Sequence, residues 1–234
     1  MPDLHVDRES LDGTDTATLP RLPAFEAFLR FGTRLPQMTK WQSAVANWAG
    51  RPELGDRTPA SVVAAAASLP EPGAAWLATP VHLVAGLDHV RLHPAGLLRL
   101  EPDVAERLAI DFARTFGEDG LALHPVGGGF LLSGLPPLDA RTEVPARLLG
   151  SNLRQAPPTG PDAHRLRRLA TEIEMWLHGL AESGSAMPGR APNALWLWGG
   201  GRSQGSAIES VPGQSCYGAL FADDAVAAAL WQLG

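Results

Sequence analysis

The chain has 234 residues, of which 45% are hydrophobic and 19% are charged, so it can bury a sizeable core and is not a disordered protein. Its net charge of −6 argues against a nucleic-acid-binding surface, and its one cysteine, Cys216, excludes an internal disulfide framework or a cysteine-rich zinc site. No apolar run reaches about 18 residues and the N-terminus is acidic, so we expect a cytoplasmic protein that binds neither nucleic acid nor membrane.

The first third of the chain has the periodicity of helices. Apolar residues recur at helical spacing in Leu22–Phe31 and again in Trp41–Trp48. Thr58 followed by Pro59 is typical of a helix start, and the alanine-rich run after it predicts a third helix. Residues 1–78 are therefore predicted to form an N-terminal helical region.

The middle of the chain alternates short strand patterns with one helix. The predicted strands are Ala75–Leu77, Val81–Ala85, His89–His93, Leu121–His124 and Gly129–Ser133. A helix beginning at Pro102 carries an apolar stripe and separates the third strand from the fourth. Residues 79–134 are thus predicted to be a β-β-α-β-β unit, an α+β unit whose helix covers one face of a sheet.

The last third, residues 135–234, begins with a proline-rich loop. Asp162 is predicted to cap a long amphipathic helix that ends at about Leu180. The strand Ala194–Trp198 follows, then a further strand at Cys216–Phe221 and a final helix capped by Asp223 and Asp224. We expect this region to pack with residues 1–78 as one domain, which makes the fold class α/β or α+β.

The most distinctive motif runs from Pro192 to Arg202, where a strand with two tryptophans enters three glycines. Glycine allows a backbone to approach a ligand closely, and its exposed N–H groups together with an arginine favour an anion. The predicted ligand is therefore a phosphorylated or carboxylated small molecule. The candidate ligand-binding residues are Asn193, Trp196, Trp198, Gly199, Gly200, Gly201, Arg202 and His178. The alternative is a tight turn that lets the tryptophans pack beneath the helix at 162–180.

Other catalytic and metal motifs are weak. The glycines are not followed by a clear helix, as a dinucleotide fingerprint requires, and no lysine follows Gly205, as a phosphate-binding loop of the Walker type requires. A three-histidine zinc site drawn from His82, His89, His93 and His124 is conceivable, but two of these lie about 13 Å apart on one strand. We therefore predict no metal site and no cofactor, and local motifs leave any catalytic residues unknown.

Several segments resemble a proteobacterial family of RpfE-type regulatory proteins, also described as phosphoglycerate-mutase-like. The specific match is PNALWLWGGGR at 192–202, preceded by the helix TEIEMWLH at 171–178. More modest matches are TPVHLVAGLDHVRL at 79–92, FGEDGLALHP at 116–125 and LPAFEAFLRFGTR at 22–34. The resemblance implies a cytoplasmic regulatory or metabolite-binding module, for which a protein partner is also possible.

That family is in turn distantly similar to the archaeal-type cofactor-independent phosphoglycerate mutases of the alkaline-phosphatase-like superfamily. Those enzymes use two divalent metal ions and a serine nucleophile, and the segment LDGTD at 11–15 only faintly echoes their first metal motif. Because no late Asp-His pair is found, we expect a protein without a complete mutase site. The alternative is an active mutase that binds Mn²⁺ or Zn²⁺. Its candidate metal ligands are Asp7, Asp12, Asp15, Asp223 and Asp224.

Overall fold

The computed structural model describes residues 30, 41–69, 75–182, 191–201 and 224–233. The chain divides into two compact units, residues 1–37 and residues 38–234, and every element described below belongs to the second unit. Of the predicted helix Leu22–Phe31 only Arg30 is described, and it is helical. The predicted strand Cys216–Phe221 lies outside the described residues.

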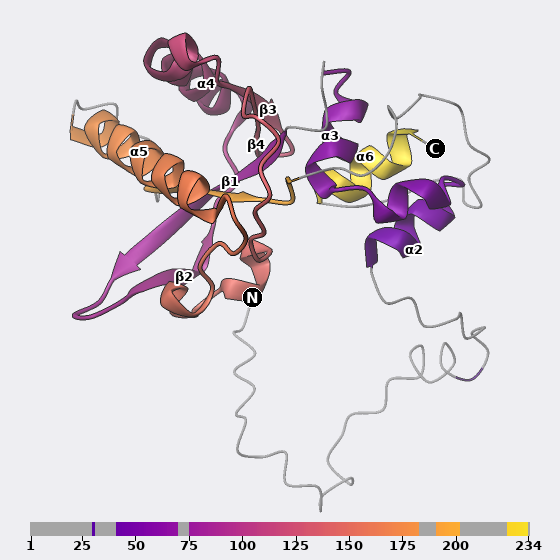
Figure 1. The fold of residues 1–234 in the computed structure, drawn as a ribbon, viewed down its shortest axis with the longest axis horizontal. Helices are drawn as coiled ribbons and strands as arrows, with labels where there is room; N and C mark the ends of the chain where they lie inside the picture. Colours follow the sequence, from indigo (N-terminus) through magenta and orange to yellow (C-terminus); the bar gives the residue numbers. More distant parts are fainter. Residues whose placement is uncertain (1–29, 31–40, 70–74, 183–190, 202–223, 234) are drawn as a thin grey trace, which may run out of the picture. The chain divides into compact units, whose positions relative to one another are not determined.

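The described elements form a mixed α/β fold with an antiparallel sheet and several helices, which confirms the predicted class at this level (Figure 1). The helices are α2 (Trp41–Trp48), α3 (Pro59–Ala66), α4 (Pro102–Phe116), α5 (Ala163–Glu182) and α6 (Ala225–Leu233). The strands are β1 (Trp76–Ala85), β2 (Val90–Leu97), β3 (Ala122–Val126), β4 (Gly129–Ser133) and β5 (Ala194–Trp198). Short 3₁₀ turns occupy Pro52–Asp56, Gly117–Asp119, Pro145–Leu148 and Leu153–Gln155.

Strand β1 is the centre of the sheet because it pairs with three other strands. Its first half pairs with β4 on one edge and with β5 on the other, and its second half pairs with β2. The carbonyl of Val81 faces β5, whereas the carbonyl of Pro80 accepts a hydrogen bond from Leu98 just beyond β2. Since backbone groups of successive residues point to opposite edges, β2 and β4 share one edge of β1 and β5 has the other. Strand β5 comes from the predicted region 135–234, so these parts of the chain share one sheet.

The sequence predicted two separate strands at Ala75–Leu77 and Val81–Ala85, and this division is wrong. A single strand runs through Pro80 and also crosses the predicted boundary between residues 78 and 79. Proline lacks an N–H and interrupts a sheet unless no ladder bond is needed at its position. At Pro80, one edge of β1 stops pairing with β4 and begins to pair with β2. The proline also lies close to β4, since an added Cβ on Gly129 would lie only 3.1 Å from its Cδ. The proline ring therefore lies at a junction between two partner strands and removes no ladder bond.

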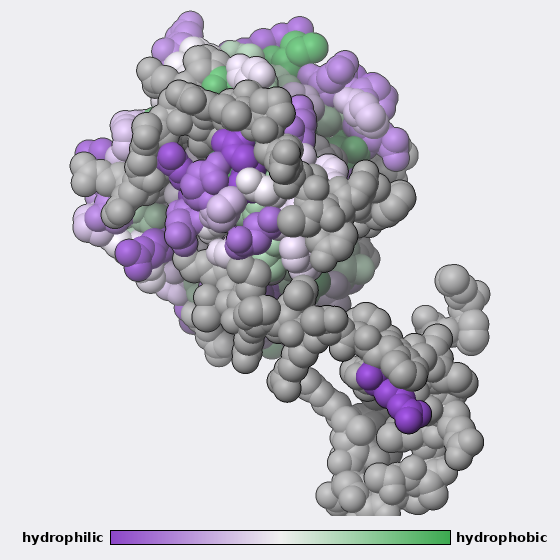
Figure 2. Space-filling view, turned by 90° about the vertical axis from the view of Figure 1, so that its right-hand side faces the viewer, coloured by the Kyte–Doolittle hydropathy of each residue, from purple (hydrophilic) through white to green (hydrophobic). Residues whose placement is uncertain are grey.

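The two faces of the sheet bury different helices. On one face, β1 and β5 contribute residues such as Trp76 and Leu197 to a core with α4 and α5. On the other face, Leu77 and Trp198 pack with α2, α3 and α6. This is the alternation expected of strands that are covered on both sides. Seen from the side of α2, α3 and α6, the described surface is mainly hydrophilic, and hydrophobic residues show only in small, separate areas (Figure 2).

Helix ends were predicted well where capping chemistry is local. Thr58 is the N-cap of α3 and its hydroxyl accepts a hydrogen bond from the N–H of Ser61. Asp224 caps α6, because its Oδ1 accepts hydrogen bonds from the N–H groups of Val226 and Ala227. In both helices a short polar side chain satisfies N–H groups that lack a partner within the helix.

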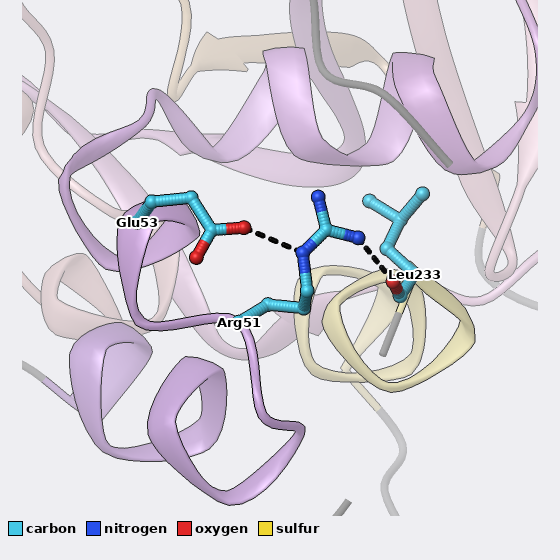
Figure 3. A network of polar contacts seen from close by, with 3 residues as sticks. All are labelled: Arg51, Glu53 and Leu233. Atoms are coloured by element: carbon cyan, nitrogen blue, oxygen red, sulfur yellow. Dashed lines mark hydrogen bonds and ion pairs between the residues drawn. The ribbon is translucent and has the colours of Figure 1, made fainter. Parts of the chain in front are cut away.

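A buried arginine joins the N-terminal helices to the last helix of the chain. Helix α2 ends in a left-handed Gly50, and the N–H of Arg51 bonds back to the carbonyl of Ala46, as in a Schellman motif. Arg51 is 9% exposed, its Nε donates to Glu53, and its Nη1 donates to the carbonyl of Leu233, 2.6 Å away (Figure 3). The cation therefore satisfies a carbonyl at the negative end of the α6 dipole, 182 residues away in sequence.

Replacing this arginine tests how much the contact stabilises the unit. We expect Arg51→Met to lower the free energy of unfolding by about 1–3 kcal/mol, because the Leu233 carbonyl loses its charged donor. The matched control is Glu53→Gln, which keeps an acceptor for Arg51 at a half-exposed position and should cost less than about 1 kcal/mol. Urea denaturation measures both, and an Arg51→Met protein as stable as the wild type would contradict the assigned role.

The same contact predicts a pH dependence. The hydrogen bond from Arg51 is the main cause that holds the pKa of Glu53 below its ordinary value. A carboxyl with a lowered pKa contributes stability above the pKa it has in the unfolded chain, about 4.3, and this contribution is lost as the pH falls through the lower folded pKa. The stability difference between wild type and Glu53→Gln should therefore shrink from neutral pH to about pH 3. A difference that stays constant over this range would refute the coupling.

Candidate functional site

Asn193, a predicted ligand contact, is bound to the neighbouring strand. Its Oδ1 accepts a hydrogen bond of 2.7 Å from the N–H of Leu83, and its Nδ2 donates one of 2.8 Å to the carbonyl of the same residue. Its own N–H bonds to the carbonyl of Val81. The side chain thus extends the ladder between β5 and β1 by one step. Both polar atoms of the amide have backbone partners.

The two tryptophans of β5 lie on one face, as predicted, but α5 is not what covers them. Leu195 and Leu197 point to the α5 face, and the tryptophans point to the opposite face. Trp198 packs in the core with α3 and α6, and its Nε1 donates a 2.8 Å hydrogen bond to Oγ1 of Thr79. Trp196 is half-buried, and its Nε1 donates to the carbonyl of Glu143. The prediction of a cover by the helix at 162–180 is wrong because the strand alternation puts the leucines, not the tryptophans, on that side.

The three glycines after β5 are in close contact with other parts of the unit. The carbonyl of Gly199 accepts a hydrogen bond from the N–H of Ala60 in the first turn of α3. An added Cβ on Gly200 would lie 2.4 Å from the indole ring of Trp76, and Gly201 is buried beside the carbonyl of Ala140. These contacts explain the glycines by packing. Ligand binding at Gly199–Gly201 stays a prediction.

Most of the remaining predicted polar and metal-binding residues lie outside the described part of the chain. His178 is exposed on α5, whereas Arg202, Asp7, Asp12, Asp15 and Asp223 lie outside the described residues. Within the described ranges, no group of three or more His, Cys, Asp or Glu side chains is arranged to hold a metal ion. The rings of His82 and His93 meet edge to face at 6.2 Å, while His124 bonds to Ser133. The histidines are thus divided between separate local contacts.

A cavity of about 380 Å³ lies on the tryptophan face of the sheet. Its floor includes Leu77, Thr79 and Trp198, and its volume falls in the range of small-molecule sites. The rest of its wall comes from the end of β2, the β3–β4 turn, the turn at 144–146 and the start of α6. Besides Leu77, Thr79 and Trp198, the residues that line the cavity are Ala78, Pro80, Leu97, Leu98, Arg99, Val126, Gly127, Gly128, Gly129, Phe130, Val144, Pro145, Ala146, Asp224, Ala225 and Val226.

Arg99 is held at this cavity by the backbone on both sides of it. The N–H of Leu98 donates to the carbonyl of Pro80, and the N–H of Leu100 donates to the carbonyl of Gly128. The arginine side chain crosses Gly128, where an added Cβ would lie 3.2 Å from its Cβ and 3.4 Å from its Nε. Gly128 has a φ of +80°, which glycine adopts without strain, so the turn both forms and leaves space for the arginine.

Asp224 brings a carboxylate to the same cavity. Its Oδ1 is occupied by the first turn of α6, and its Oδ2 takes no part in those two bonds. The next residue, Ala225, contacts the β3–β4 turn, since an added Cβ on Gly127 would lie 2.8 Å from its Cβ. The site is therefore an apolar hollow with a guanidinium and a carboxylate near one glycine turn.

Asp224 is predicted from the sequence as a helix cap and a candidate metal ligand, whereas no sequence pattern selects Arg99. Eighteen of the nineteen basic residues are arginines, so no compositional signal distinguishes this one. Its position three residues before the proline-initiated helix α4 is also common on protein surfaces. Only the packing against Gly128 identifies it as part of a site.

Substituting two glycines with alanine tests the packing role of the segment after β5. Gly200→Ala should destabilise the protein by about 1–3 kcal/mol, because its Cβ would overlap the fully buried ring of Trp76. Gly179→Ala in α5 is the matched control. Its Cβ would meet nothing within 4 Å, so better helix propensity should stabilise the protein by about 0.5–1 kcal/mol. Thermal and urea unfolding measure both changes, and equal effects of the two substitutions would contradict the packing role.

Comparison with known proteins gives no relative from which a function could be transferred. No protein-family description matches the chain, and neither a curated protein nor a solved structure does. None of the described helices is long and apolar enough to cross a membrane. The function is therefore argued from the geometry of the cavity and from the resemblance noted in the sequence.

Proposed function

We propose that this chain is an RpfE-type, phosphoglycerate-mutase-like regulatory protein that binds a phosphorylated or carboxylated small molecule and does not convert it. The observation that carries the proposal is the 380 Å³ cavity with Arg99 on its wall. An arginine offers five N–H donors in a fork that matches carboxylate and phosphate oxygens. The cavity thus supplies a volume and an anion-binding group in one place.

The proposed anion contact differs from the one that the sequence motif favours. The motif places the anion at Gly199–Arg202, where the glycines have close packing partners in Pro59, Trp76 and the carbonyl of Ala140. By contrast, the glycine turn at 127–128 lines the cavity, and its close contacts are with Arg99 and Ala225, which line the cavity too. We therefore assign the ligand to the cavity.

A second candidate function is an active mutase that uses Mn²⁺ or Zn²⁺. One observation favours it: Asp224, one of the five aspartates proposed as metal ligands, lies at the cavity. A carboxylate beside a bound phosphate ester is the donor type that a divalent cation prefers. Conversion of 3-phosphoglycerate to 2-phosphoglycerate by the purified protein with added Mn²⁺, lost on chelation, would favour this reading over a binding protein.

Calorimetric titration of the full chain tests the binding proposal. The probes are 3-phosphoglycerate, inorganic phosphate and 4-methylpentanoate, each up to millimolar concentration. At least one should bind, and Arg99→Met should weaken that binding about tenfold or more, since a charged hydrogen bond is lost. The matched control is Arg107→Met on α4, where the arginine is exposed and pairs with Asp103, and it should leave binding unchanged.

The results of these titrations distinguish the cavity from the glycine segment after β5 as the binding site. Binding that survives Arg99→Met but is lost in Arg202→Ala would return the ligand to the glycine segment after β5. No binding of any probe, including the amino acid introduced below, would overturn the proposed function.

A further inference from the structure

The cavity carries one positive and one negative side chain. Among the described residues that line it, only Arg99 and Asp224 have charged side chains. Both residues are exposed, so a ligand that enters from solvent can meet them. A cavity with balanced charges favours a ligand with both charges over a ligand with one.

The glycine turn contacts both chain segments that carry these charges. Gly128 contacts Arg99, and Gly127 contacts Ala225, the residue after Asp224. The α-carbons of consecutive residues are about 3.8 Å apart, so the two chain segments meet on neighbouring sides of the turn. Each contact is close enough that a side chain on the glycine would interfere with it. The turn is thus the element that lies between the two segments that carry the charges.

The rest of the cavity is suited to an apolar group. Leu77, Val144 and Trp198 line it, together with Pro80. The hydroxyl of Thr79 already accepts the indole N–H of Trp198. Burying a hydrocarbon side chain against this wall is favourable because it removes apolar surface from water. A strongly hydrophilic ligand would leave this surface unused.

We infer that the cavity binds a free α-amino acid with an apolar side chain, its carboxylate on Arg99, its ammonium on Asp224 and its side chain against Trp198. The inference rests on the proposed function and names the ligand class within it. Arg99 makes other contacts within the protein, and the five donors of a guanidinium allow it to bind a carboxylate as well. Asp224 offers Oδ2 to the ammonium while Oδ1 keeps its bonds to α6.

The charge balance also argues against a phosphate ester as the preferred ligand. A phosphate group carries close to two negative charges at neutral pH and has three acceptor oxygens. One arginine satisfies part of this group, and the carboxylate of Asp224 repels it. The first-turn N–H groups of Val226 and Ala227, which would attract a phosphate at an uncapped helix, already bond to Asp224.

Three ligands of similar shape test the inference by calorimetry on the full chain. L-leucine has both charges, 4-methylpentanoate lacks the ammonium, and 3-methylbutylamine lacks the carboxylate. We expect L-leucine to bind at least about tenfold more tightly than either analogue, which corresponds to the loss of one charged hydrogen bond. It should also bind more tightly than 3-phosphoglycerate.

Two variants connect this preference to the two charges. Asp224→Asn keeps a good helix cap, because asparagine caps as well as aspartate, but removes the negative charge. It should reduce the preference for L-leucine over 4-methylpentanoate to about one while leaving thermal stability nearly unchanged. Arg99→Met should weaken L-leucine and 4-methylpentanoate by similar factors, and Arg107→Met should change neither.

The failures of the two proposals are distinguishable. Equal binding of L-leucine and 4-methylpentanoate to the wild type, or a preference that Asp224→Asn leaves intact, would overturn the amino-acid inference. Tighter, Arg99-dependent binding of 3-phosphoglycerate would overturn it too, while supporting the broader proposal of a metabolite-binding protein. Binding of L-leucine that is as tight in Arg99→Met as in the wild type would place the ligand elsewhere and refute the assigned site.

Discussion

Strand β1 is the element on which the rest of the unit depends, because both of its edges and both of its faces are used. Its edges pair with β5 on one side and with β4 and β2 on the other. Its faces send Trp76 to the core under α4 and α5, and Leu77 to the core under α2, α3 and α6. A strand buried in this way cannot shift by one residue without exchanging the two cores, so its register is strongly determined.

Helix α6 shows how distant parts of the chain are joined around this sheet. Asp224 satisfies its first N–H groups, and Arg51 satisfies a carbonyl at its other end. The negative side chain lies at the positive end of the helix dipole and the positive side chain at the negative end, so both contacts are electrostatically favourable. One of these residues is next to the helix in sequence, and the other is 182 residues away.

The candidate site follows from the same arrangement. Because α6 packs on the face of Trp198, the start of the helix meets the β3–β4 turn and the end of β2 at the cavity. Pro80 and Gly129 are in contact at the point where β1 changes its partner strand. Arg99 lies next to this point, because the residue before it, Leu98, donates its N–H to the carbonyl of Pro80. The charges at the cavity are therefore positioned by strand pairing and by a glycine turn, both of which are rigid compared with a long loop.

The sequence by itself determined the elements whose signals are local. The caps at Thr58 and Asp224, the apolar stripes of α4 and α5, and the alternation that puts Trp196 and Trp198 on one face all follow from neighbouring residues. It did not determine which helix covers the tryptophans, that the strand continues through Pro80, or that Arg99 and Asp224 meet at one cavity. Those outcomes depend on which strands pair and which faces pack, and such contacts join residues far apart in the chain, so only the tertiary structure decided them.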